Sequence, residues 1–215
     1  MKTLLALLLL LFASSLSFGQ KFQDVTARGA PVSLLVKHDY ADMGPYAAVR
    51  NTSNKGILAF VTVITTTDEH GQAVPCTGRA DFIFRSSALA PQEERFACLM
   101  DASDPSAKVV ETVGAVLFVQ FEDGSTWGNV EAGEQVLSAR PKKFAFLKRL
   151  VETYYESGED AFAAALNAPE HSYSSPEFAV AGCLKSDAEY EKVATIDLAK
   201  KRLAAAQEWR ALGIF

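Results

Sequence analysis

The chain has 215 residues, 49% of them hydrophobic and 22% charged, and its formal net charge at pH 7 is −5. Nucleic-acid binding calls for a basic face, and the sequence shows none. This ordinary, mildly acidic composition favours a protein, a glycan or a small molecule as the partner.

The first residues have the pattern of a cleavable export signal. Lys2 precedes an uncharged apolar run from Leu4 to Phe12, and small residues that include Ser17 and Gly19 follow. A membrane anchor is the alternative, but a span needs about 20 mostly apolar residues, more than this core supplies. We predict a signal peptide at residues 1–19, no stable membrane insertion after its cleavage, and an exported protein that is periplasmic or extracellular. No cysteine follows the apolar core, so a lipid anchor is not expected.

The next hundred residues show the spacing of a β-sandwich, with a turn signal about every 8–12 residues. The strongest strand is Ile57 to Thr67, because it is rich in β-branched residues. Both of its faces are partly apolar, which suits a central strand covered by a second sheet. We therefore predict a mainly β fold, with an antiparallel sandwich of about seven strands over residues 20–130. The expected strands are 32–38, 46–51, 57–67, 74–85, 95–100, 108–121 (one strand, or two split near Gly114) and 126–127.

The pattern becomes helical after Asn129. Apolar residues recur at helical spacing, and Gly158 is expected to stop the first helix. Ser186 with Glu189 three residues later has the form of a capping box, which predicts the start of the last helix. The helical region is expected to pack on the sandwich or on a partner. It spans residues 131–215, with helices at 142–156, 159–167 and 187–212.

Export permits disulfides, and the chain holds three cysteines. Cys76 and Cys98 lie in adjacent expected strands and are the natural pair. In a symmetric hairpin, however, Arg79 to Asp81 would face Cys98, so a bridge needs a slipped register or a contact across the two sheets. The register favours two buried unlinked thiols, and the bridge stays the alternative. Cys183 is expected to be a small buried residue of the helical region.

The histidines offer one candidate for a metal site. His38 stands beside Asp39 and close to Asp42, but zinc and similar ions need three or four converging ligands, and the rest would have to come from elsewhere. A solvated strand end is the simpler interpretation. His70 is expected at a hairpin tip and His171 in a loop. No metal site and no cofactor are predicted.

Reactive motifs are missing. The segment Gly124-Ser125-Thr126-Trp127-Gly128 has threonine where a nucleophile elbow has its serine, and it looks like a hairpin rather than a strand-to-helix turn. The carboxylate pairs Glu93/Glu94 and Asp101/Asp104 are loop neighbours, and their spacing does not place them about 5–10 Å apart in a cleft. We predict no catalytic residue, and a protein that is not an enzyme.

Aromatic residues are the best candidates for recognition, because they contribute much of the contact energy at interfaces and sugar sites. At helical spacing such residues more often pack in a core or between domains, and this remains the alternative. The first helix is also basic along one side, but the acidity of the chain argues against membrane-surface binding. The candidate binding surface comprises Trp127, Phe144, Phe146, Tyr154 and Tyr155.

One family resemblance follows from the turns. The run Val49 to Phe60, with its Asn51-Thr52-Ser53 turn, followed by the turn that holds Gly71 and later by Leu89 to Glu93, resembles exported bacterial Ig-like domains of the FxLYD kind. Gln92 stands where glycine is usual, and the tyrosine-aspartate signature is absent. The resemblance covers residues 31–129 and implies an Ig-like sandwich in an exported bacterial protein. It transfers no catalytic residue. The Asn51 turn is also a glycosylation sequon, although a polar turn is its simpler interpretation.

These patterns favour an exported, non-enzymatic binding or structural protein of the cell envelope or periplasm, with a protein or glycan partner. Two alternatives stay open. One is a carbohydrate-binding module that presents Trp127, and the other is a hydrolase whose site is built from scattered loop residues.

Overall fold

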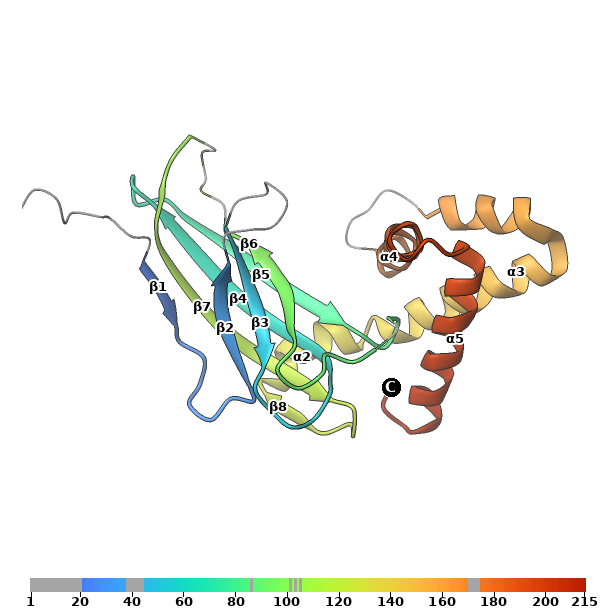
Figure 1. Ribbon diagram of the computed structural model, residues 1–215, viewed down its shortest axis with the longest axis horizontal. Coiled ribbons are helices and arrows are strands. Elements are labelled where there is room, and N and C mark those ends of the chain that lie inside the picture. The colour runs from blue at the N-terminus through green and yellow to red at the C-terminus, as the bar shows by residue number, and fades with distance from the viewer. Residues whose placement is uncertain are drawn as a thin grey trace, which may run out of the picture.

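The computed structural model describes residues 21–37, 45–85, 87–100, 102, 104, 106–169 and 175–215, so the predicted signal peptide lies outside the described residues. Strands occupy the chain up to Gly128, and helices follow from Val130 (Figure 1). The protein is 39% helical and 34% strand, so it is a mixed α/β protein and the prediction of a mainly β fold is wrong. Two helices that the sequence did not predict, α2 (Val130–Leu137) and α4 (Pro176–Glu191), account for much of the difference.

The described strands form two sheets that make a sandwich. One sheet has the order β1-β7-β4-β5, with β8 beside β7, and the other has the order β2-β3-β6. Neighbouring strands are antiparallel except β1 and β7, which pair in parallel. The strands are β1 (Lys21–Asp24), β2 (Val32–Lys37), β3 (Tyr46–Asn51), β4 (Ile57–Asp68), β5 (Ala73–Asp81), β6 (Glu94–Leu99), β7 (Val109–Phe121) and β8 (Thr126–Gly128).

Strand β4 is central, as the sequence predicted, and it is covered on both faces. On its inner face Phe60 belongs to the apolar cluster between the two sheets. On its outer face Ala59 and Val61 pack with Phe118 of β7 and Val136 of α2. Gly133 allows α2 to approach this closely, because a Cβ at that position would lie 2.5 Å from the Phe118 ring.

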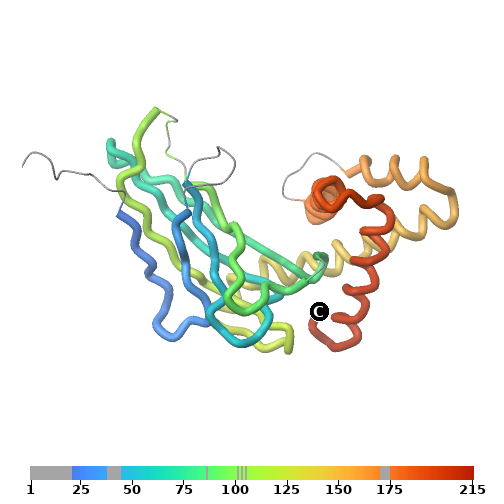
Figure 2. Tube along the Cα trace, viewed as in Figure 1, coloured from blue at the N-terminus to red at the C-terminus, as the bar shows by residue number. Residues whose placement is uncertain are grey.

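The remaining helices form a second apolar core beyond the end of the sandwich (Figure 2). Leu147 and Leu150 of α3 and Leu184 of α4 are fully buried there. Gly158, with φ 84°, interrupts α3 at the predicted stop, and the chain turns into its second half. The helices are α2 (Val130–Leu137), α3 (Arg140–Asn167), α4 (Pro176–Glu191) and α5 (Thr195–Ala211).

The predicted capping box at Ser186 is wrong, because Ser186 lies inside α4. The residue that caps α4 is Ser175, whose hydroxyl accepts a hydrogen bond from the Phe178 amide. The break comes later, at Lys192, which adopts the left-handed conformation with φ 55°. A serine followed three residues later by glutamate also fits within a continuous helix, so the pattern alone does not locate a start.

The segment Phe82–Phe84 joins the two cores. Sequence periodicity assigned it to a strand, but β5 ends at Asp81 and the chain turns, with the Arg85 amide donating to the Phe82 carbonyl at 2.9 Å. Phe82 then packs in the sandwich, whereas Ile83 and Phe84 pack in the helical core. A short continuous apolar run is ambiguous between a strand and a buried turn.

Cys76 and Cys98 form a disulfide, with their Cα atoms 6.5 Å apart. Cys76 lies on β5 and Cys98 on β6, which belong to different sheets. The expected β5–β6 hairpin is therefore wrong, and the bridge is the contact across the two sheets that the sequence left as an alternative. Cys183 is a free, half-buried thiol. The Asn51 side chain is fully buried and donates to the carbonyls of Lys55 and Leu89, which makes it a turn residue.

Replacing Gln92 with glycine is expected to stabilise the protein by about 1 kcal/mol, because a left-handed residue other than glycine costs about 1–2 kcal/mol. Gln92 has φ 65° and follows Pro91 in a turn closed by the Glu93 amide and the Ala90 carbonyl. Urea unfolding measures the gain. Gln72→Gly is the matched control, since Gln72 is exposed without a positive φ and should lose stability. A loss at Gln92 would contradict the prediction.

Candidate functional site

The predicted aromatic surface does not exist as one exposed patch. Phe144 and Phe146 are 8% and 3% exposed, which is the core packing that the sequence left as the alternative for both. They lie on the face of α3 that packs into the helical core. Trp127 is half-buried against the inter-sheet cluster, and Tyr154 is partly buried in the helical core. Only Tyr155 of this set is largely exposed, at 70%.

The histidine candidates lie mostly in segments that the structure does not describe. His38, Asp39, Asp42 and His171 all fall outside the described residues. His70 lies in the turn after β4, with its side chain exposed. Within the described part of the chain, no three His, Cys, Asp or Glu side chains gather closely enough to hold a metal.

The carboxylates Glu93 and Glu94 serve ion pairs on the sandwich surface. Glu93 contacts Arg95 at 2.7 Å, and Glu94 contacts both Lys37 and Arg50. Hydrogen bonds from Lys37 and Arg50 lower the pKa of the Glu94 carboxyl, and the one from Lys37 has the larger effect. Asp101 lies outside the described residues. Asp104 accepts hydrogen bonds from the amide and hydroxyl of Ser106 within its own loop. The segment from Gly124 to Gly128 is a hairpin between β7 and β8, as predicted.

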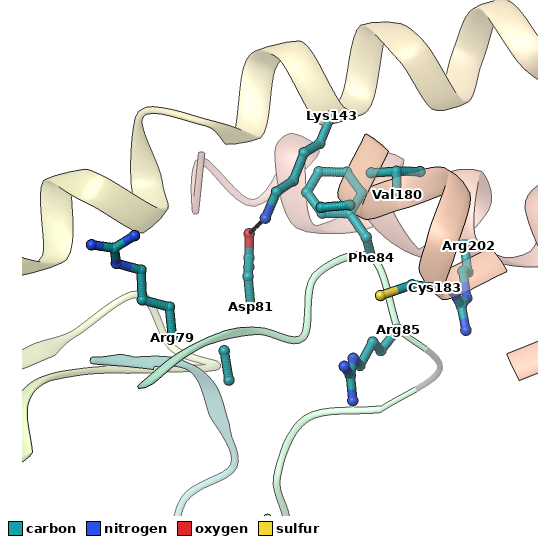
Figure 3. A pocket seen from close by; sticks show the side chains of 10 residues that line it. Arg79, Asp81, Phe84, Arg85, Lys143, Val180, Cys183 and Arg202 are labelled. Carbon is teal, nitrogen blue, oxygen red and sulfur yellow. Dashed lines mark hydrogen bonds and ion pairs between the residues drawn. The ribbon is translucent and has the colours of Figure 1, made fainter. Parts of the chain in front are cut away.

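A cleft lies where the sandwich meets the helices. We call it the junction cleft, and it consists of adjoining hollows that share Arg79 and Ala80 of β5 as lining. The inner hollow has a volume of about 150 Å³ and lies among β5, α3, α4 and α5 (Figure 3). The outer hollow has a volume of about 470 Å³ and extends to Phe96 on β6 and Asp187 on α4.

The charge of the junction cleft is opposite to that of the whole protein. Five cationic side chains line it in the described part of the chain, against two carboxylates, Asp81 and Asp187. This is an excess of three positive charges in a protein whose net charge is −5. The cations are Arg79, Arg85, Arg95, Lys143 and Arg202.

Asp81 is buried and paired with two cations. Its side chain is 4% exposed, and it contacts Arg140 at 3.1 Å and Lys143 at 3.1 Å. Arg140 is fully buried and also donates to the Gln120 side chain at 2.6 Å. Burial lowers the pKa of the Arg140 guanidinium, and the charge of Asp81 opposes this effect. The Asp81–Arg140–Lys143 network therefore joins α3 to the sandwich.

Arg202 brings buried charge to the inner hollow. Its side chain is 3% exposed and forms an ion pair with Asp187 through one terminal nitrogen. Its Nε is buried and has no hydrogen-bond partner among the described residues, and the same holds for Nε of Arg95 in the outer hollow. Buried donors without a partner are uncommon in native structures. Both atoms are enclosed by protein, so the exposed cations of the cleft, not these two atoms, are the ones that an entering group can contact.

The outer cations of the cleft are available to a ligand. Arg79 and Arg85 are exposed, and neither has an ion pair within the described residues. The Arg85 guanidinium lies 5.8 Å from the centre of the Phe82 ring. Sequence reasoning missed this site. The close spacing of Arg79, Arg85 and Arg95 in an acidic chain was a weak signal for it, but Arg202 follows more than a hundred residues later.

No described helix combines the length and the apolar composition that a bilayer span requires. Comparison of the chain with protein-family models, with curated proteins and with solved structures gives no match.

Proposed function

We propose that the protein is an exported, non-enzymatic binding protein of the cell envelope, and that the junction cleft binds an anionic group of its partner. The excess of cationic side chains in the cleft carries this proposal. Arg79 and Arg85 are exposed and have no ion pair in the part of the chain that the structure describes. Such arginines are suited to carboxylate or phosphate groups, because the planar guanidinium offers several donors.

Export is supported by the composition of the first residues and by the disulfide. Residues 1–19 have the three parts of a secretory signal. The bridge between Cys76 and Cys98 suits an oxidising compartment, because disulfides persist outside the cytosol and are rare within it.

An Ig-like relationship is part of the same proposal, and strand order supports it. In Ig domains strands A, B and E share one sheet, while C, F and G share the other, joined by C′ in variable-type domains. Here β2, β3 and β6 share one sheet, and β4, β5, β7 and β8 share the other. Taken in chain order, the first three strands correspond to A, B and E, and the other four correspond to C, C′, F and G. The strand β1 is additional and pairs with β7.

The two alternatives gain less support. A carbohydrate-binding module needs an exposed aromatic platform, but Trp127 is half-buried. A hydrolase needs a base or nucleophile that is free to act, but Asp81 in the cleft is held by two cations. A reproducible hydrolase activity that one point mutation abolishes would overturn the non-enzymatic proposal.

Citrate, a small polycarboxylate, is expected to bind in the junction cleft of the purified protein. Amide chemical shifts should change around Arg79, Arg85 and Arg202, and rising salt should weaken the binding. Exposed charges contribute modestly, so the double variant Arg79→Gln/Arg85→Gln should lose about tenfold in affinity. Arg28→Gln is the control, because Arg28 is exposed in the turn between β1 and β2, away from the helices (Figure 1). Equal losses in both variants would contradict the proposal.

A further inference from the structure

We propose that the inner hollow of the junction cleft receives the side chain of a glutamate from an acidic segment of a partner protein. This inference rests on the proposed function and names the group that the cleft recognises. It is carried by the size of the hollow and by its mixed apolar and cationic lining, in which Arg79 and Arg85 are exposed.

The size of the hollow selects a side chain rather than a whole ligand. Sites for complete small molecules measure about 300–1,000 Å³, whereas the inner hollow measures about 150 Å³. A single side chain therefore fills it, and the rest of the ligand must lie outside. The outer hollow, at about 470 Å³, adjoins it and shares Arg79 and Arg85 as lining, so it offers room for the residues on either side.

The walls of the inner hollow suit the two methylene groups of glutamate. Phe84 and Val180 are buried apolar residues that line it, together with Ala179 (Figure 3). Contact with these residues removes the methylene groups from water and buries no polar group. A sugar acid would instead bring hydroxyl groups, and buried hydroxyls without partners cost free energy. The lining therefore favours an acidic peptide over an acidic glycan.

The cations of the hollow suit the carboxylate at the end of that side chain. Arg85 lines the hollow, is exposed and has no ion pair within the described residues, so its guanidinium is open to a carboxylate. Arg202 on the same lining is paired with Asp187, and Arg79 adds a second exposed positive charge. Hydrogen bonds between charged groups are stronger than neutral ones. Glutamine has nearly the same shape without the charge, so it should bind far less well.

The test compares two capped peptides, Ac-Ala-Ala-Glu-Ala-Ala-NH2 and the same sequence with glutamine at its centre, by chemical-shift titration of the purified protein. We expect the glutamate peptide to bind about tenfold more tightly, as is typical of one hydrogen bond to a charged group. Arg85→Gln removes an exposed cation of the lining, and it should reduce the preference for glutamate. Arg28→Gln, at an exposed position between β1 and β2, should leave the preference unchanged.

Further probes separate this inference from the proposed function. Equal binding of the two peptides would overturn the inference, and so would binding of inorganic phosphate or glucuronate as tightly as the glutamate peptide. The proposed function would stand in both cases, because an anion still enters the cleft. Failure of citrate, phosphate, glucuronate and both peptides to perturb the cleft would overturn both proposals.

Discussion

Replacing Asp81 with asparagine is expected to destabilise the protein by about 3–5 kcal/mol, the cost of leaving a buried charge without its partner. Arg140 is fully buried, and Asp81 is its only carboxylate contact within the described residues. Asparagine keeps the shape of the side chain, so the loss of stability measures the contribution of the Asp81 charge. The same change also releases Lys143, which joins α3 to the end of β5.

Denaturant unfolding measures this effect, and Asp160→Asn is the matched control. Asp160 is an exposed residue of the same protein, on α3, with no ion pair to any described residue. Its replacement should change stability by no more than about 0.5 kcal/mol. A cost at Asp81 no larger than that at Asp160 would show that the network contributes little to stability. A second transition at lower denaturant would indicate that the helical part unfolds first.

Removing the disulfide with the double variant Cys76→Ser/Cys98→Ser is expected to cost about 3 kcal/mol on the chain-entropy model. The two cysteines are 22 residues apart, and their bridge joins strands of different sheets. The unfolded chain therefore gains freedom when the bridge is absent. Urea unfolding under oxidising conditions measures the difference.

Thiol counting and reduction provide the controls for this prediction. The unfolded wild-type protein should titrate one thiol, Cys183, and three after reduction. Adding a reductant to the wild-type protein should lower its stability towards that of the double variant. Cys183→Ser should have a small effect, because that thiol is only half-buried. Three free thiols without reduction, or an unchanged unfolding midpoint, would contradict the bridge.

The strands were predictable because local chemistry decides them. The strand expected at Ile57 to Thr67 is β4, and that at Tyr46 to Asn51 is β3. β-branched side chains fit a pleated, half-buried surface, and these runs are rich in them or bounded by turn residues. The proposed split of β7 near Gly114 did not occur. A Cβ at Gly114 would lie 2.8 Å from Leu34, so this glycine permits close packing of the sheets instead of a turn.

The aromatic candidates show that local sequence does not determine which side chains are buried. Helical spacing placed Phe144 and Phe146 on one helix, but spacing does not reveal which side of that helix faces a core. The structure turns both inward, and Phe144 meets Phe215 from the far end of the chain at 5.9 Å. Burial of large apolar side chains is favourable wherever a second surface is available.

The amino-acid sequence by itself determined the order of the elements: an export signal pattern, then strands, then helices. Each of these depends on neighbours in the chain, through periodicity and turn residues. Only the tertiary structure decided which cations pair and which stay free. Lys143 and Arg140 meet Asp81, whereas Arg79, Arg85 and Nε of Arg202 meet no carboxylate of the described residues. Electrostatic contacts depend on distance in space, and these residues come from β5, the segment after it, α3 and α5.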